Sequence, residues 1–393
     1  MPKPKLLLLN GSHSEIPLIH AAKKLGFYVI TTGNQPQLPG HQLSDEYHFG
    51  DFSDEVAMLE LAGTLKVDRV CSSANDFGII SAAYVGEHLN FPGHDSYETA
   101  LLLHHKDRFK QFAKQFNIKT PKALSFSTRE EALSGCSAFK LPAMVKPIDL
   151  TGGKGVSKVV RAEDFAPAIE KAFQLSPAGK VVIEEFFTGT QHSFSCFLVG
   201  KKVHVYFSDN EFSFRNPYLV TTSSAPADHI EIYAEGLIAE AEKTAELLDL
   251  VDGVLHFQFL ANGSDFQIIE MTRRCSGDLY PYPVSISTGI DWAEWIVKAE
   301  TGSACEGLPH VQQVGFGGRH CIMSEENGVV VDVKIDSRLE EFVVDQVMWW
   351  EKGDEITDYD VQKLGILIFS FPSREVMIKV IANLKDWVKV TVA

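Results

Sequence analysis

The sequence lacks any apolar run long enough for a membrane-spanning helix. Its first apolar segment, Leu6 to Leu9, ends at Asn10 and is too short for the core of a signal peptide. We therefore read this segment as a first β-strand. A cytoplasmic protein without a membrane partner is the resulting expectation.

Cysteines are few and basic residues are not clustered. The six cysteines form no CxxC pair, which is typical of reduced thiols and gives little support to a zinc site or a disulfide framework. The 36 Lys and Arg residues are outnumbered by 52 Asp and Glu residues, giving a net charge of -16, so we expect no nucleic-acid partner. The negative net charge does not exclude binding of a small anionic ligand, because a few well-placed cations and backbone amides are enough to bind it.

Two common nucleotide-binding signatures are also absent. No GxxxxGK[ST] motif occurs, which excludes a Walker phosphate loop. The first turn, Asn10-Gly11-Ser12-His13, lacks the three-glycine fingerprint of dinucleotide-binding folds. A nicotinamide-dependent dehydrogenase is therefore disfavoured.

The pattern that is present divides the chain into regions. Its 393 residues exceed what one hydrophobic core usually serves, so we expect two or three domains. The first region alternates apolar strands with amphipathic helices and predicts a doubly wound parallel sheet. We expect its strands at 6–10, 28–32 and 70–72 and its helices at 16–25, 54–65 and 77–89.

The middle region becomes rich in strands, and the last region, from about residue 307, predicts a small α+β cap. We expect middle strands at 143–146, 181–187, 193–198 and 202–207, a hairpin of 255–260 with 266–271, and helices at 106–116, 233–248 and 292–300. The cap ends in a helix near 373–387.

A lysine followed by a glycine-rich loop is the strongest local signal. Val145-Lys146-Pro147 ends a strand, and Thr151-Gly152-Gly153-Lys154-Gly155-Val156 follows. Glycines let the backbone approach a ligand and expose its amides to phosphate. Many glycine clusters are plain turns, but the upstream lysine favours phosphate binding.

Two further elements carry oxygen-bearing side chains. The strand Val181 to Phe187 ends in Glu184, Glu185 and two phenylalanines, a pattern equally typical of an edge strand with solvated glutamates. On the hairpin, Gln258 lies on one strand, and alternation places Glu270 and Thr272 on one face of the other strand; oxygens clustered in this way suit Mg²⁺. The alternative is a hairpin with one polar face, although Arg274 just beyond favours a site for metal-bound phosphate.

With these three elements in this order, the chain resembles the ATP-grasp superfamily, in the branch of carbamoyl phosphate synthetase large subunits, biotin carboxylase and phosphoribosylamine-glycine ligases. The resemblance implies an α/β and α+β multidomain fold. Residues 1–104 correspond to an N-terminal Rossmann-like domain, and 105–304 to an ATP-grasp core of two α+β subdomains, with the lid at about 120–187. Residues 305–393 correspond to a small C-terminal domain like that of biotin carboxylase.

The resemblance also implies roles for single residues. Lys106 and Lys146 match the phosphate-binding lysines, and Gly152, Gly153, Lys154 and Gly155 match the mobile lid loop. Glu184 matches a residue near the adenine amino group, Glu185, Phe186 and Phe187 the adenine-binding hinge, and Gln191 and His192 positions near the ribose. Gln258, Glu270 and Thr272 fall on metal-ligand positions, and Arg274 on the arginine that faces the transferred phosphoryl group.

Two positions depart from the family pattern. Gln191 stands where many relatives have glutamate, and Thr272 stands where the family usually has asparagine. An amide still suits the ribose hydroxyls, whereas a threonine hydroxyl reaches less far than an amide oxygen. We therefore expect a second metal ion to be held more loosely.

The implied activity is that of an ATP-dependent carboxylate-amine ligase, which forms an acyl phosphate and then a C–N bond. ATP and Mg²⁺, with Mn²⁺ as an alternative metal, would be its cofactors, and a small carboxylate and a small amine its partners; a homodimer stays open. Arg215 and Asp278 are candidate substrate residues, although an exposed loop arginine and a helix N-cap are the competing interpretations. The competing function is a non-catalytic ATP-binding regulatory protein.

Overall fold

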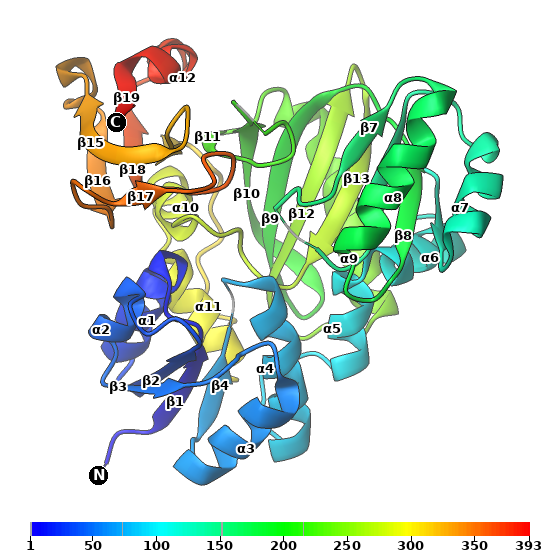
Figure 1. Cartoon of the computed structure of the whole chain (residues 1–393). Helices are drawn as coiled ribbons and strands as arrows, with labels where there is room; N and C mark the ends of the chain where they lie inside the picture. The colour runs from blue at the N-terminus through cyan, green and yellow to red at the C-terminus, as the bar shows by residue number, and fades with distance from the viewer. Residues whose placement is uncertain (1, 73, 151, 215) are drawn as a thin grey trace.

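The computed structural model describes residues 2–72, 74–150, 152–214 and 216–393. Figure 1 shows three lobes: an N-terminal lobe in blue, a lobe around α7 and α8 in cyan and green, and the C-terminal segments in orange and red beside a large central sheet. Among the described residues, no helix is both long enough and apolar enough to cross a membrane.

The N-terminal lobe is a parallel sheet in the order β3-β2-β1-β4, which confirms the predicted doubly wound fold. Leu6 and Leu8 pack against α1 and α11 on one face, and Leu7 and Leu9 pack with α3 and α4 on the other, so the leucine run is buried on both sides. Its strands are β1 (Lys5–Leu9), β2 (Tyr28–Gly33), β3 (Glu46–Phe49) and β4 (Arg69–Cys71), and its helices are α1 (Ile16–Lys24), α2 (Pro39–Leu43), α3 (Glu55–Leu65) and α4 (Asp76–Leu89).

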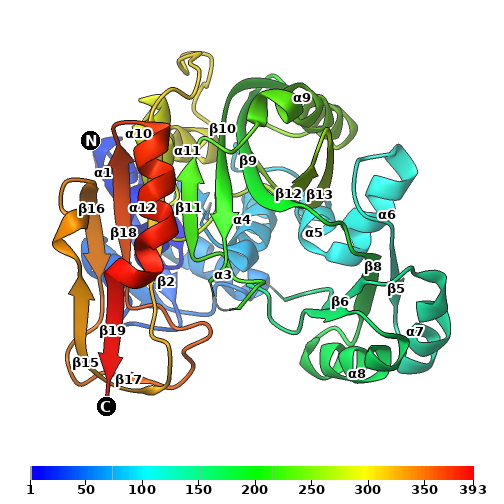
Figure 2. The same ribbon diagram turned by 90° about the horizontal axis from the view of Figure 1, so that it is seen from above.

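A second, smaller sheet has the order β5-β8-β6-β7 and forms the lobe on the right of Figure 2. Its inner core joins Val145 and Ile183 to α7 and α8, which cover one face and leave the other face free for Lys146 and Glu184. Its elements are β5 (Ala123–Phe126), α7 (Arg129–Gly135), β6 (Ala143–Pro147), β7 (Ser157–Val159), α8 (Phe165–Leu175) and β8 (Val181–Glu185).

The large sheet has eight strands in the order β13-β12-β9-β10-β11-β14-β18-β16. The pairing of β11 with β14 continues this sheet across residues 304/305, where we expect a domain boundary. The predicted hairpin is present, whereas β10 continues five residues beyond its predicted end. The strands are β9 (Thr190–Val199), β10 (Lys202–Phe212), β11 (Thr222–Ala225), β12 (Gly253–Asn262), β13 (Asp265–Thr272), β14 (Phe316–Ile322), β16 (Val343–Met348) and β18 (Gly365–Phe371).

The two faces of the large sheet have different surroundings. Phe194, Phe257 and Phe259 pack on one face with α6 and α9. On the other face, Phe197 and Phe207 pack against α10, α11 and the N-terminal lobe. The helices are α5 (Tyr97–His104), α6 (Lys106–Phe116), α9 (Ile230–Leu247), α10 (Pro281–Thr288) and α11 (Trp292–Glu300).

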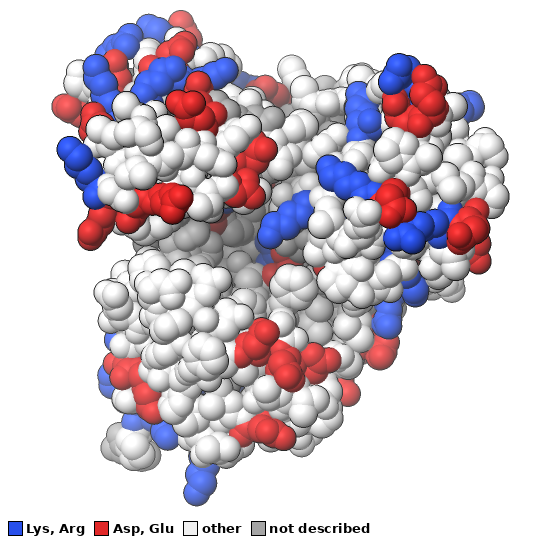
Figure 3. All heavy atoms as spheres, viewed as in Figure 1, with Lys and Arg blue, Asp and Glu red and all other residues white. Residues whose placement is uncertain are grey.

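The C-terminal region closes the molecule with a three-stranded sheet, β17-β15-β19, and helix α12. Leu367, Phe369, Val380 and Leu384 belong to their shared core. The elements are β15 (Gly328–Ile335), β17 (Glu355–Ile356), α12 (Arg374–Trp387) and β19 (Val388–Val392). The surface is hollowed where the three lobes meet, with basic side chains on the rim beside the smaller sheet (Figure 3).

Candidate active site

A cluster of lysines lies on the free face of the smaller sheet. The Lys146 Nζ pairs with Glu184 Oε1, and Lys110 Nζ, from α6, lies 3.2 Å from Glu184 Oε2. Burial raises the pKa of Glu184, but the two lysines outweigh burial and lower this pKa to about 2. The carboxylate is therefore ionised at neutral pH, and the two ammonium groups together exceed its charge.

Lys106 connects this cluster to the glycine-rich loop. Its Nζ donates to the Leu150 carbonyl at 2.6 Å, and its backbone N–H donates to the Ile148 carbonyl at 3.3 Å. Burial lowers the pKa of Lys106, while Glu270 acts to raise it. Helix α6, which begins at Lys106, packs against β8 of the smaller sheet and against β13 of the large sheet, which carries Glu270.

The glycine-rich loop needs its glycines for backbone conformation. Gly152, Gly153 and Gly155 all have positive φ values, between 64° and 73°. A Cβ on Gly153 would lie 2.6 Å from the Tyr218 carbonyl oxygen, so the loop touches the segment after β10 closely. Lys154 is exposed, and Thr151 lies outside the described residues.

The segment after β8 carries the predicted adenine hinge. The Glu185 N–H donates to the Lys122 carbonyl at 2.9 Å, and the Phe186 N–H donates to the Pro142 carbonyl at 3.3 Å. Lys158 Nζ lies 3.7 Å from the centre of the Phe186 ring. These contacts hold Glu185 and Phe186 to the smaller sheet, and half-buried Phe187 follows them towards β9.

The placement of His192 corrects a sequence-based expectation. His192 is buried, its Nε2 lies 2.6 Å from Thr190 Oγ1, and its ring stacks on Phe259 at 5.3 Å. Because strand side chains alternate, His192 lies on the opposite face of β9 from Gln191. We therefore leave His192 out of the proposed nucleotide site.

The polar side chains of the large sheet form a row across four adjacent strands. Gln258 on β12 pairs in register with Glu270 on β13, and Gln191 follows on β9. Both Gln191 Nε2 and Gln258 Nε2 donate to Glu211 Oε2 on β10, each at 2.8 Å. Thr272 lies two residues beyond Glu270 and pairs in register with His256. The row brings oxygen atoms of Gln258 and Glu270 to one face of the sheet.

Arg274 binds a carboxylate of the N-terminal lobe. Its Nε and Nη2 donate to the two oxygens of Asp76 at 2.6 and 2.8 Å, and its Nη1 donates to the Cys275 carbonyl at 2.8 Å. Burial acts to lower the pKa of Arg274, but Asp76 raises it above its usual range. The guanidinium is thus held rigidly across the joint between two lobes.

Asp278 lies in a second charged cluster that spans three parts of the chain. Its oxygens accept from Lys363 Nζ at 2.6 Å and from Arg319 Nη1 at 3.0 Å, and His13 Nε2 lies 3.4 Å away. Burial acts to raise the pKa of Asp278, but the charges of Lys363 and Arg319 hold it well below its usual range. The N-cap interpretation is wrong, because α10 begins at Pro281 with Tyr280 as its N-cap. Arg215, the other candidate substrate residue, lies outside the described residues.

Sequence reasoning missed several members of the site. Lys110 lies one helical turn after Lys106, and this spacing on a predicted helix was a usable signal. Glu211 falls in the unpredicted extension of β10, and its burial cannot be read from a polar segment. Asp76 could not be found, because its partner is 198 residues away.

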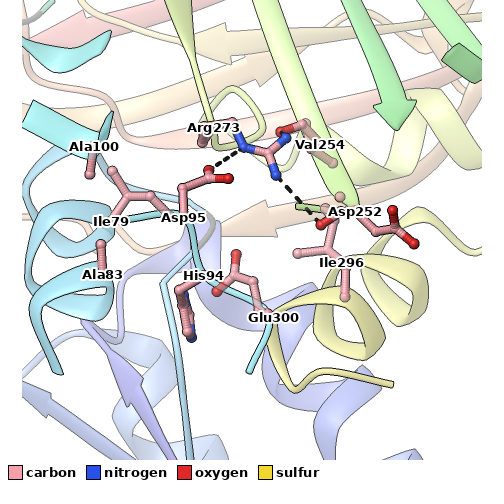
Figure 4. A pocket seen from close by; sticks show the side chains of 13 residues that line it. Ile79, Ala83, His94, Asp95, Ala100, Asp252, Val254, Arg273, Ile296 and Glu300 are labelled. Atoms are coloured by element: carbon pink, nitrogen blue, oxygen red, sulfur yellow. Dashed lines mark hydrogen bonds and ion pairs between the residues drawn. The ribbon is translucent and has the colours of Figure 1, made fainter. Parts of the chain in front are cut away.

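Arg273, next to Arg274, points into a different environment (Figure 4). Its Nε donates to Asp95 at 2.6 Å, and its other nitrogens donate to the Val254 and Val251 carbonyls at 2.6 and 2.7 Å. A small hollow here is lined by His94 and Glu300 among others, and by none of the lysines or glutamines described above. Arg273 therefore joins the N-terminal lobe to the large sheet.

Comparison with known proteins finds a family match for part of the chain. Residues 104–213 match the family described as phosphoribosylglycinamide synthetase, ATP-grasp (A) domain. This stretch of the chain is therefore similar to an ATP-grasp domain. A phosphoribosylamine-glycine ligase from Pyrococcus furiosus is 30% identical over 208 residues, which are 51% of this chain and 46% of that protein. The chain spans about half the length of the curated relatives it matches.

Solved structures show that the likeness in fold extends beyond the ATP-grasp domain. An L-amino acid ligase from Bacillus licheniformis superposes with a TM-score of 0.83 and 19% identity over all of both chains. The biotin carboxylase domain of Hydrogenobacter thermophilus 2-oxoglutarate carboxylase, a dimer with MgADP and bicarbonate, has a TM-score of 0.79 and 17% identity. This superposition covers all of this chain and 91% of the biotin carboxylase domain chain. At these identities the superposition shows the fold alone.

Proposed function

We propose that this ATP-grasp protein is an ATP-dependent ligase that activates a carboxylate as an acyl phosphate and joins it to an amine. The observation that carries the proposal is the presence of opposite chemistries on the smaller and the large sheet. Lys106 and Lys146 provide cations on one side, and Gln258 and Glu270 provide oxygens on the other. Helix α6, which begins at Lys106, contacts both β8 of the smaller sheet and β13 of the large sheet, which supports this pairing.

The oxygen row fits a magnesium ion that is shared with ATP. Carboxylate and amide oxygens are hard ligands of the kind that Mg²⁺ prefers. Among the described residues, no group of three His, Cys, Asp or Glu side chains is placed to hold a metal ion, so the protein ligands need completion by phosphate oxygens. We propose Glu270 and Gln258 as these ligands, with Thr272 as a weaker third and Mn²⁺ as a substitute ion. When bound, the ion would neutralise the β and γ phosphates.

The remaining residues would bind and screen the nucleotide. Lys146 and Lys106 would hold phosphate oxygens, and the amides of Gly152, Gly153 and Gly155, with Lys154, would close over them. The segment Glu184 to Phe187 would border the adenine, and the outward oxygen of Gln191 would face the ribose. Closing the loop would keep water from the acyl phosphate, which hydrolysis would otherwise destroy.

In the proposed reaction, an oxygen of the substrate carboxylate attacks the γ phosphorus, and ADP leaves. The amine nitrogen then attacks the acyl carbon, the C–O bond to phosphate breaks, and phosphate leaves with that electron pair. Arg274, held by Asp76, would stabilise negative charge during transfer. We propose the cluster of Asp278 with Arg319 and Lys363 as the border of the substrate site, with Arg215 as a further candidate.

The partners of the reaction would be a small carboxylate and a small amine, in the cytoplasm. The biotin carboxylase domain that shares this fold is a dimer, and we propose a homodimer as the assembly to test by light scattering. A monomer at micromolar concentration would contradict that assembly and leave the chemistry untouched.

The test is a coupled ADP-release screen that crosses a carboxylate library, including bicarbonate, with an amine library. We expect ADP release that requires both members of one pair, and mass spectrometry of the product would identify the new C–N bond. The competing function is a non-catalytic ATP-binding regulatory protein, for which Thr272 and Gln191 are the motivating departures. ATP binding without ADP release for any pair would favour that function.

A further inference from the structure

Glu211 holds a central place in the polar row of the large sheet. It lies on β10, 7% exposed, and its Oε2 accepts one hydrogen bond from Gln258 Nε2 and one from Gln191 Nε2. The side chains thus come from three adjacent strands, β12, β9 and β10. Glu270, on β13, ends the row on the other side. Carboxylates therefore lie at both ends and amides lie between them.

The hydrogen bonds to Glu211 decide how the two amides are oriented. The Nε2 atoms of Gln258 and Gln191 each lie 2.8 Å from Glu211 Oε2, and a carboxyl oxygen accepts a hydrogen bond from an amide NH₂, so the NH₂ of each glutamine faces Glu211. The amide oxygen of Gln258 then points away from Glu211. Since a glutamine has one amide oxygen, a flipped Gln258 would present its NH₂ to a cation in place of a ligand.

We propose that Glu211 is a positioning residue that fixes the Gln258 amide with its oxygen towards the divalent cation. The inference rests on the proposed metal site at Gln258 and Glu270. Glu211 itself acts through the amide and is not a ligand in this proposal. It explains why a neutral ligand at position 258 is accompanied by a buried carboxylate two strands away.

The second glutamine fits the same arrangement. Gln191 donates to the same Oε2 atom as Gln258, so its amide oxygen is also turned away from Glu211. One buried carboxylate thereby orients two amides that lie on neighbouring strands. Outer partners of this kind commonly contribute 10- to 100-fold to metal affinity, roughly the size of effect expected here.

The test measures Mn²⁺ binding in the presence of ADP by electron paramagnetic resonance, so that it does not depend on catalysis. In Glu211→Gln the side chain at 211 has its own NH₂, and the Gln258 amide loses its orienting acceptor. We expect Mn²⁺ affinity to fall roughly 10- to 100-fold. Unchanged affinity in a folded Glu211→Gln protein would overturn the inference.

A double variant separates orientation from a merely structural role. In Glu211→Gln/Gln258→Glu the donor and acceptor are exchanged, and the new carboxylate presents an oxygen to Mn²⁺ in either orientation. We expect the double variant to recover most of the affinity that Glu211→Gln loses. Gln258→Glu alone places two carboxylates against each other and should bind Mn²⁺ less well than the double variant. A double variant as weak as Glu211→Gln would overturn the inference.

Two controls keep the outcomes distinct. Glu300→Gln changes another buried glutamate, which accepts from the Ser72 N–H at 2.7 Å in the joint around Arg273, and should leave Mn²⁺ binding unchanged. Loss of Mn²⁺ binding in Glu300→Gln would show that removing any buried carboxylate is sufficient, and would overturn the specific role of Glu211. Failure of the unaltered protein to bind Mn²⁺ with ADP would instead contradict the proposed function.

Discussion

The two sides of the candidate site, one on the smaller sheet and one on the large sheet, carry opposite kinds of side chain. On the smaller sheet, Lys110 and Lys146 surround the single carboxylate of Glu184, with Lys106 nearby, so cations are in excess. On the large sheet, Glu270 and Glu211 flank two glutamines, so oxygen acceptors dominate. A nucleotide triphosphate with a divalent cation needs both environments at once. Neither sheet alone would therefore be sufficient to bind such a ligand.

Removal of Glu270, the proposed metal-binding carboxylate, should have the largest effect. In Glu270→Ala the acceptor side loses its principal anionic ligand, and we expect ADP formation to fall roughly 10²- to 10³-fold or more. The measurement is ADP release with the substrate pair from the screen. Asp265→Asn, an exposed change at the start of the same strand, is the control. Near-normal turnover in folded Glu270→Ala would refute the assignment of the acceptor side.

The next effect comes from the cationic side. Lys146→Ala should raise the KM for ATP, because one phosphate-binding ammonium is lost and buried Glu184 keeps Lys110 as its partner. We expect roughly a 10-fold change, comparable to the loss of one charged hydrogen bond. Steady-state kinetics over a range of ATP concentrations would measure it, with exposed Lys140→Ala as control. An unchanged KM would show that the lysine cluster serves stability alone.

Lowering the pH should reduce the stability of the protein through Glu184, the carboxylate of the cationic side. Its folded pKa, about 2, is depressed from 4.5, so its contribution to stability is present above pH 4.5 and is lost as pH falls towards 2. The shift corresponds to a contribution on the order of 3 kcal/mol. Glu184→Gln should remove this part of the dependence of the unfolding free energy on pH in denaturant titrations. If the unfolding free energy changed equally with pH between 4.5 and 2 in Glu184→Gln and in the unaltered protein, the ion pairs of Glu184 would not contribute to stability as stated.

The smallest effect concerns the loop that joins the two sides. Gly153→Ala puts a Cβ against Tyr218 at a φ of 73°, and we expect a loss of about 1 kcal/mol in stability and slower turnover. Gly179→Ala has a similar φ of 62° with no atom within 4 Å of the added Cβ, so it shares the backbone strain without the contact. Equal turnover in the two variants would mean that the contact with Tyr218 is irrelevant to loop closure.

The two sides also differ in how far sequence could predict them. Lys146 and the glycines are adjacent in the chain, so a local motif was enough, and helix 106–116 has the predicted bounds. The parallel N-terminal sheet followed from its βα alternation and the hairpin from its turn, whereas the pairing of Gln258 with Glu270 is seen only in the structure. The acceptor side beyond that hairpin depends on strand order and on the extension of β10, and neither is encoded in a local pattern.

Two further residues have surroundings that only the fold could supply. Arg274 was predicted as a phosphate-facing arginine, whereas its partner Asp76 comes from another lobe and could be found only from the fold. His192 was placed near the ribose by the resemblance alone, yet it lies on the opposite face of β9 from Gln191, because adjacent residues on a strand face opposite sides. Long-range contacts and side-chain alternation thus set the limit of the prediction.

Formation of an acyl phosphate is the central claim, and oxygen transfer tests it most directly. The carboxylate identified in the screen would be supplied with ¹⁸O in its carboxyl group, and the released phosphate would be analysed by mass spectrometry. The account predicts one ¹⁸O atom in each phosphate, because a carboxylate oxygen attacks the γ phosphorus. Unlabelled phosphate from a reaction that still forms the C–N bond would contradict it.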